Sequence, residues 1–232
     1  MSSTTSRRYN SAPAKNYLLR TYVRSEVVVV YKTKEDFGGL SNMASGYPLQ
    51  INGVHILTTE ALYQACRFPH MPEVQREIIR QHSPMTAKMK SKPHRKDSRS
   101  DWDEVRYKIM RWCLRVKLAQ NYDEFGRLLL ATRDRPIVEQ SRKDDYWGAK
   151  LTDESGDTLI GQNVLGRLLM ELRKKLQDDA DGSLKTVPPL GIPDFLLLSK
   201  PIETVTSNRS SNGQKPQLGL FKIASRDEQS SF

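Results

Sequence analysis

The chain has 232 residues, enough for one domain of ordinary size with tails, and a core of that size needs no disulfide or metal for its stability. Its two cysteines, Cys66 and Cys113, form no CxxC pair and lack ligand spacing to the four histidines, which argues against a disulfide framework and a structural zinc. The net charge is +10, and much of it is local: the stretch from Thr86 to Lys117 holds eleven Lys or Arg against four acids. Such a field concentrates phosphate-bearing partners, although a solvated helix face would have the same composition.

Two patterns bear on the compartment. No apolar run approaches the ~18 residues that a membrane helix needs. Residues Met1–Asn10 are rich in Ser and Thr and lack the apolar segment of a secretory signal. We therefore expect a cytoplasmic protein in a reducing compartment, without a membrane partner.

The N-terminal third predicts a flexible arm, a strand and a hairpin. Residues 1–25 are expected to form the arm, and the four valines of Glu26–Lys32 predict a strand. Leu49–Ile51 and Val54–Leu57 flank Asn52-Gly53, a strong hairpin signal.

A helix is expected next, with Thr58 or Thr59 as its N-cap. The polar residues Glu60, Tyr63, Gln64 and Arg67 share one face of this helix, because they fall at positions i, i+3, i+4 and i+7. A polar face usually meets solvent. Here the face begins with a carboxylate directly after a hairpin, which is an unusual place for a surface residue.

The remaining elements follow from hydrophobic spacing. Helices are expected over 73–81, 84–90, 101–120, 125–131 and 163–176, a short strand over 136–139 and a turn over 143–148, while the basic stretch 91–99 is expected to be a loop. Beyond Gln177 the prolines at 188, 189, 193 and 201 break regular structure, Leu190–Leu198 is apolar enough to pack on the domain, and Thr206–Pro216 resembles a linker.

Six blocks of sequence resemble the NADAR domain family in the family's order. They are Leu40-Ser41-Asn42, Thr59–Ala65, Ser83–Lys88, Asp101–Arg106, Val138–Gly148 and Gly161–Arg173. The fifth block follows a Val-Glu-x-Ser-x-x-Asp-x-x-Trp-Gly pattern, to which we assign Asp145, Trp147 and Gly148. The chain departs from the family at Ala61, where a histidine is usual, and at Arg67, where a lysine is usual; the second change argues against a reactive amine at that position.

This resemblance implies the fold and the activity. It implies an α+β, mainly α-helical fold, with a single NADAR glycosidase domain over 26–178, a small antiparallel sheet from the N-terminal half, and a C-terminal extension over 179–232 that packs partly on the domain. The family includes bacterial riboflavin-pathway N-glycosidases and antitoxins that remove ADP-ribose from guanine in DNA. We expect the second activity here, with ADP-ribosylated DNA and a cognate ADP-ribosyltransferase toxin as partners, because a small metabolite would not need so basic a segment. The alternatives are hydrolysis of a phosphoribosylamino-pyrimidine of riboflavin synthesis, and an ADP-ribose or nucleic-acid binding module without turnover.

The chemistry of an N-glycosidase needs carboxylates. Breaking a C1′–N bond develops positive charge on the sugar and requires a proton on the leaving nitrogen, and a carboxyl group can meet either need. Glu60 is the first catalytic candidate, with a helix-dipole carboxylate as the competing interpretation. Asp145 is the second, binding ribose hydroxyls while Trp147 stacks on the base; a capped turn beside a packed indole is the alternative.

Lys88 is the third catalytic candidate, because its amine could capture C1′ as a Schiff base; the alternative is a phosphate-binding lysine. Trp102 lies either in the core or at the pocket, and Arg95, Lys96 and Arg99 either hold phosphates or belong to a solvated loop. The predicted substrate-binding residues are Ser41, Asn42, Tyr63, Gln64, Arg95, Trp102, Trp147, Gly148 and Asn163. No cofactor or metal is expected.

Overall fold

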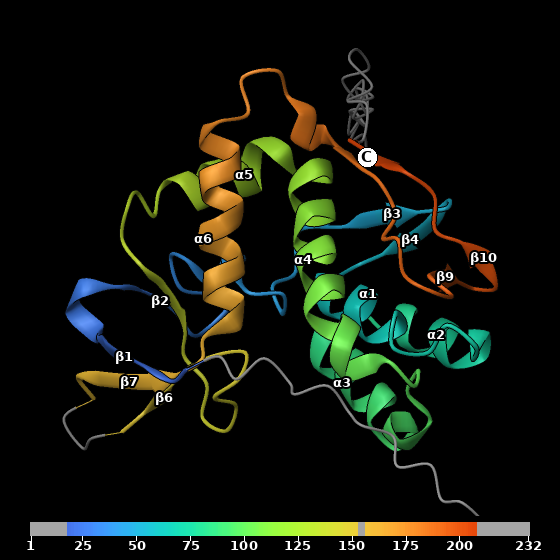
Figure 1. Ribbon diagram of the computed structural model, residues 1–232, viewed down its shortest axis with the longest axis horizontal. Coiled ribbons are helices and arrows are strands. Elements are labelled where there is room, and N and C mark those ends of the chain that lie inside the picture. Colours follow the sequence, from blue (N-terminus) through green and yellow to red (C-terminus); the bar gives the residue numbers. More distant parts are fainter. Residues whose placement is uncertain (1–17, 153–155, 208–232) are drawn as a thin grey trace, which may run out of the picture.

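The computed structural model describes residues 18–152 and 156–207, in which helices from the middle of the chain pack on short strands from both ends (Figure 1). The α-helices are α1 (Thr59–Ala65), α2 (Pro72–Ile79), α3 (Pro84–Ser91), α4 (Trp102–Gln120), α5 (Tyr122–Leu130) and α6 (Val164–Gln177). The 3-10 helices are η1 (Arg24–Glu26), η2 (Gly38–Leu40), η3 (Lys92–Asp97) and η4 (Ser183–Lys185). The strands are β1 (Arg20–Val23), β2 (Val28–Val30), β3 (Leu49–Ile51), β4 (Val54–Ile56), β5 (Ile137–Glu139), β6 (Lys150–Leu151), β7 (Thr158–Gly161), β8 (Thr186–Val187), β9 (Leu196–Leu197), β10 (Lys200–Pro201) and β11 (Val205–Thr206). The fold is α+β and mainly helical, as predicted.

Local sequence signals set the hairpin and the helix that follows it. Strands β3 and β4 pair in antiparallel register across Asn52 and Gly53, whose φ angles of 50° and 78° match the left-handed turn that these residues favour. Thr58 caps α1, because its hydroxyl accepts the Ala61 N–H at 3.2 Å. The hairpin therefore delivers the chain directly into α1 and fixes where Glu60 stands.

The strand pairing differs from the sequence prediction in two ways. Residues 20–23, expected in the flexible arm, form β1, which pairs antiparallel with β7, and β7 pairs in turn with β6. Strand β2 pairs with β5 in parallel register. The small antiparallel sheet is thus built from both halves of the chain. Its β1 and β7 strands are more than a hundred residues apart, so local propensity does not reveal that they pair. Residues 1–17 of the expected arm lie outside the described residues.

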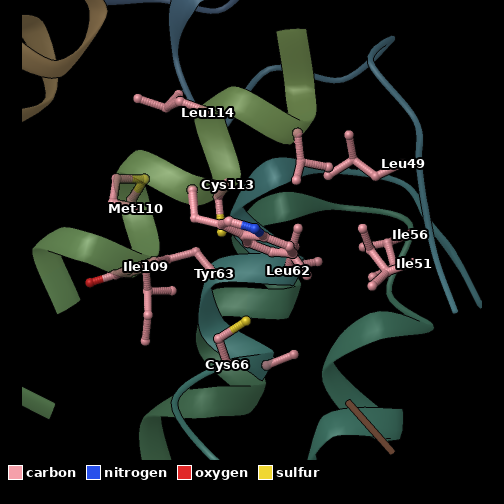
Figure 2. Packing of buried hydrophobic residues seen from close by; sticks show 14 of the residues in the cluster. Leu49, Ile51, Ile56, Leu62, Tyr63, Cys66, Ile109, Met110, Cys113 and Leu114 are labelled. Carbon is pink, nitrogen blue, oxygen red and sulfur yellow. The ribbon is translucent and has the colours of Figure 1, made fainter. Parts of the chain in front are cut away.

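The core is centred on α4, which the apolar stripe predicted. In the close view of Figure 2, Leu62 and Tyr63 of α1 lie between Ile109 and Met110 of α4 on one side and Leu49, Ile51 and Ile56 of the β3–β4 hairpin on the other. Helix α6 lies alongside α4 in Figure 1 and packs against it. Cys66 and Cys113 are both buried, as their apolar surroundings predicted, and neither forms a disulfide with a described residue. In the described part of the chain, no helix is both long enough and apolar enough to span a membrane.

The segment after α6 covers the back of α2 and α4. The Trp112 indole N–H donates to the Pro188 carbonyl at 2.9 Å, and the Phe195 ring meets the Trp112 ring edge-on at 4.9 Å between centroids. The Arg99 guanidinium, 7% exposed, donates to Asp101 and to the Pro193 carbonyl, so Arg99 anchors this segment and is not part of a solvated loop. The structure describes only residues 206 and 207 of the linker-like stretch predicted over 206–216, because residues 208–232 lie outside the described residues.

Candidate active site

A pocket of about 300 Å³ opens where α1, α3, α4 and the turn after β5 meet. The elements that form it come from both halves of the chain. Its wall consists of Asn42, Met43, Glu60, Tyr63, Gln64, Arg67, Lys88, Arg95, Trp102, Arg106, Met110, Glu139, Gln140, Ser141, Asp144, Trp147 and Leu165. The pocket therefore brings together eight of the twelve residues predicted for the site: Asn42, Glu60, Tyr63, Gln64, Lys88, Arg95, Trp102 and Trp147.

Glu60 is held by amide donors on both carboxyl oxygens. Its side chain is 3% exposed; one oxygen accepts from the Gln64 Nε2 at 2.8 Å and the other from the Asn42 Nδ2. The Glu60 backbone N–H also donates to the Asn42 carbonyl at 3.0 Å. Burial raises the pKa of Glu60, while Lys88, the Gln64 hydrogen bond, Arg67 and Arg95 act in the opposite direction. Donors on both oxygens favour the charged form.

A second ring of contacts orients Gln64. Its Oε1 accepts from the Ser91 hydroxyl at 2.8 Å, and Ser91 is fully buried at the end of α3. With its carbonyl occupied in this way, Gln64 presents its NH₂ group to Glu60. The polar face of α1 is therefore buried and meets the pocket and its neighbouring helices; the usual expectation of a solvent-facing polar stripe does not apply here.

Glu139 is a pocket carboxyl that the sequence interpretation missed. It ends β5 and is partly buried, while its neighbour Val138 faces the second, smaller hydrophobic cluster. Burial raises the pKa of Glu139 to about 8; the charges of Glu60 and Asp144 add to this effect, and Lys88 and a hydrogen bond from Ser41 oppose it. The Val-Glu pair that opens the fifth family-like block was the signal that could have identified it.

Asp145 is placed outside the pocket, which corrects the alignment of that block by one residue. Its side chain is 50% exposed and forms an ion pair with Lys150 at 2.6 Å, which holds the pKa of Asp145 below its usual range. Asp144 occupies the seventh position of the pattern and lines the pocket. Its Oδ1 accepts the N–H groups of Tyr146 and Trp147 at 3.0 and 2.9 Å, so it also shapes the turn that presents the indole.

Aromatic rings form one wall of the pocket. The Tyr63 ring lies 5.2 Å from Trp102 and 5.6 Å from Trp147, between ring centroids. Trp102 is only 7% exposed, yet it borders the pocket, so both interpretations of this residue hold in part. The Arg67 guanidinium stacks over Trp102 at 4.3 Å, and the Arg106 guanidinium stacks over Tyr146 at 4.1 Å.

Four cations reach the pocket from the turn after α1 and from α3, η3 and α4. They are Arg67, Lys88, Arg95 and Arg106. The pKa of Arg67 is lowered by burial, and the nearby charges of Arg95 and Arg106 lower it further. A cluster of like charges around a cavity is an electrostatic site for an anionic group such as a phosphate.

The basic stretch of residues 86–117 does not form one continuous surface. Lys117 is fully buried, Arg99 is paired with Asp101, and Arg111 is paired with Glu171 at 2.9 Å. Residues 92–97, expected as a loop, form η3, where Arg95 lines the pocket and Lys96 is exposed. Of the basic residues of this stretch, Lys88, Arg95 and Arg106 line the pocket.

Ser41, Gly148 and Asn163 support the pocket from behind and do not line it. Asn163 adopts a left-handed backbone with φ of 49°; its side chain accepts the Glu139 N–H at 3.0 Å and donates to the Ile137 carbonyl at 2.8 Å. A Cβ at Gly148 would lie 2.4 Å from the Glu139 carbonyl, so only glycine allows this close approach. These residues fix β5 and hence Glu139.

Comparison with known proteins identifies relatives of this chain. The profile of the NADAR domain family matches residues 29–177. The N-glycosidase YbiA of Escherichia coli (strain K12) is 35% identical over 165 residues, which cover 71% of this chain and 97% of the relative. A riboflavin biosynthesis protein of Vibrio vulnificus is 32% identical over 170 residues, covering 72% of this chain and 43% of the relative. The NMR structure of E. coli YbiA matches with a TM-score of 0.54 and 33% identity, over 67% of this chain and 91% of that one.

Proposed function

Because this chain belongs to the NADAR domain family, we propose that it is an N-glycosidase that hydrolyses the bond between C1′ of a phosphate-bearing ribosyl group and the nitrogen of a base. The observation that carries the proposal is the pair of carboxyl groups, Glu60 and Glu139, in one pocket with different surroundings. Environments that separate two carboxyl groups divide the acid and base roles between them.

The reaction assigns one role to each carboxyl. As the C1′–N bond breaks, its electron pair stays on the nitrogen and Glu139, which keeps its proton near neutral pH, donates that proton to the leaving base. Glu60, held between its two amide donors, stabilises the positive charge on the sugar and takes a proton from the water that bonds to C1′. The proton returns to Glu139 through solvent, which completes the cycle.

The finer proposal concerns the substrate. We propose ADP-ribose attached to guanine in DNA, which would make the protein an antitoxin to a DNA ADP-ribosyltransferase toxin. Its support is electrostatic: three arginines and Lys88 meet in the pocket, and Lys92 and Lys96 are exposed on η3 beside Arg95. A pyrophosphate and a nucleic-acid backbone are both polyanions that such a rim attracts. Trp147, which is only partly buried at the pocket wall, offers an indole for contact with a base.

A second candidate substrate is a phosphoribosylamino-pyrimidine of riboflavin synthesis. It is favoured by the comparisons, since one of the relatives is a riboflavin biosynthesis protein. The same pocket would hold its single phosphate on the arginines and its sugar at the carboxyl pair. The two substrates differ chiefly in whether they need the exposed cations of η3.

Lys88 offers a second route through the same pocket. Its side chain is partly buried and lines the cavity. In this route the ribose ring opens and the free amine bonds to C1′ as an imine while the base leaves with a proton; water then releases the sugar. Borohydride trapping during turnover tests it, because reduction of an imine would leave a sugar adduct on Lys88, and the absence of an adduct would exclude the route.

The deciding experiment offers both substrates to the full chain and follows the products by chromatography. Release of ADP-ribose from an ADP-ribosylated guanine oligonucleotide supports the first substrate. Activity on the pyrimidine nucleotide alone supports the second. Tight binding of either ligand without product would indicate a binding module and would contradict the proposed activity. Asp145→Asn is the matched control, because Asp145 is a neighbouring carboxylate that the pocket does not use.

A further inference from the structure

Lys117 of α4 is a fully buried cation that the proposed chemistry does not use. Its side chain is 0% exposed, and it forms no ion pair with any of residues 18–152 and 156–207. Its ammonium donates to the carbonyl oxygens of Gly39 at 2.6 Å and Ser41 at 3.0 Å. The rings of Tyr47 and Phe125 lie 4.3 and 4.5 Å from it. Burying an ammonium without a carboxylate costs free energy, which these carbonyls and ring faces offset only in part, because burial lowers the pKa of Lys117 to about 7.

The loop held by Lys117 contacts both carboxyl groups of the pocket. The Ser41 side chain hydrogen-bonds to Glu139. The next residue, Asn42, donates from its side chain to Glu60 and accepts the Glu60 N–H on its carbonyl. Two consecutive residues therefore touch the two groups that carry the reaction.

The loop is also closely packed against the rest of the protein. A Cβ at Gly39 would lie 2.4 Å from the Tyr47 hydroxyl, and a Cβ at Gly38 would lie 2.4 Å from the Lys32 carbonyl. The backbone of η2 thus lies against its neighbours with no room for a side chain. Within this packing, the Lys117 ammonium binds the backbone at the point where η2 ends and Ser41 begins.

We infer that Lys117 is a positioning residue for the N-glycosidase reaction: by fixing the Ser41 carbonyl, it determines where the two carboxyl groups stand in the pocket. This inference rests on the proposed function. Lys117 itself does not reach the pocket wall, so its effect passes through Ser41 and Asn42. Small displacements of reacting groups have large effects on rate, since a shift of about 1 Å can cost about a hundredfold.

The test replaces Lys117 with methionine, which has similar length and no donors. We expect kcat to fall roughly 10- to 100-fold while KM stays within about threefold, because the phosphate-binding arginines are not attached to this loop. Leu114→Ala is the matched control: Leu114 is 1% exposed on the same helix and lines a separate cavity with Leu168 and Leu172 of α6. It should lower the unfolding midpoint and leave kcat of the folded enzyme unchanged. Where Lys117→Met does not fold, Lys117→Gln, which keeps an N–H donor, takes its place.

A second readout needs no substrate. The hydrogen bond from Ser41 lowers the pKa of Glu139, so a loosened loop should raise the midpoint at which Glu139 titrates. Carboxyl ¹³C NMR of the free protein measures that midpoint in the wild type and in Lys117→Met. An upward displacement supports the positioning role even if the wild type cleaves neither substrate, in which case only the proposed function fails. A folded Lys117→Met with wild-type kcat or an unchanged Glu139 titration would overturn the inference.

Discussion

Replacing Glu139 by glutamine should change how the stability of the protein depends on pH. The pKa of Glu139 is raised from an ordinary value of 4.5 to about 8, chiefly by burial. The unfolded chain therefore releases this proton near pH 4.5, while the folded protein keeps it until about pH 8. Across that window the unfolded state binds fewer protons, so the free energy of unfolding falls as pH rises.

The magnitude follows from the two pKa values. At about 1.36 kcal/mol for each pKa unit, the rise at Glu139 corresponds to a loss of up to about 5 kcal/mol between pH 4.5 and pH 8. Glutamine stays neutral and removes this loss. Glu139→Gln should therefore resemble the wild type near pH 5 and exceed it in stability by several kcal/mol at pH 8.

The assay is urea unfolding of both proteins at pH 5 and pH 8. The change in the free energy of unfolding between the two pH values is measured for each protein, and subtracting one change from the other cancels the contribution of the other titrating groups. Glu104→Gln, an exposed carboxylate on α4, serves as the control and should track the wild type at both pH values. Parallel pH dependences of Glu139→Gln and the wild type would refute the reasoning, because Glu139 would then ionise as freely in the folded protein as in the unfolded chain.

The remaining predictions concern the pocket and its rim. Asp144→Asn should lower kcat about tenfold or more and reduce stability by about 1 kcal/mol, because the Asp144 carboxylate caps the Trp147 turn. Asp145→Asn should leave kcat within about twofold, because Asp145 pairs with Lys150 outside the pocket. Steady-state kinetics on the two variants checks both expectations, and equal effects would contradict the corrected alignment. Affinity for an ADP-ribosylated oligonucleotide should fall steeply between low and physiological salt, as fluorescence anisotropy would show, and a flat dependence would point to the small metabolite. Trp147→Ala should weaken substrate binding by about 1 to 3 kcal/mol in a calorimetric titration, and unchanged affinity would remove the indole from base stacking.

The parts of the fold that depend on neighbouring residues could be predicted from the sequence. Asn52-Gly53 determined the hairpin, Thr58 the start of α1, and the apolar stripe the extent of α4. The long-range pairings could not be predicted in this way. Strand β1 finds its partner in β7 across most of the chain, and β2 pairs in parallel with β5. Such pairings depend on packing of the whole domain.

The candidate site, like the fold, could be predicted where it depends on local spacing and could not where it depends on packing. The polar face of α1 was visible as spacing, and its burial depends on α3, α4 and η2 closing over it. The choice between Asp144 and Asp145 depends on the turn, in which one carboxylate caps two N–H groups and its neighbour turns out to Lys150. Glu139 has no periodic signature, because it is a single carboxylate at the end of a short strand. Its sequence signal was the Val-Glu pair of the fifth family-like block, and its place beside Glu60 follows from the fold.

The most direct test of the proposed activity is the comparison of wild type and Glu60→Gln on whichever ribosylated substrate the wild type cleaves. Single-turnover rates and ligand dissociation constants are measured for both proteins. We expect the variant rate to fall by about a hundredfold or more while the dissociation constant stays within about threefold, because glutamine has the shape of glutamate, keeps one oxygen to accept the Gln64 donor and carries no charge. A Glu60→Gln protein that cleaves at nearly the wild-type rate would contradict the assignment of Glu60 to the reaction.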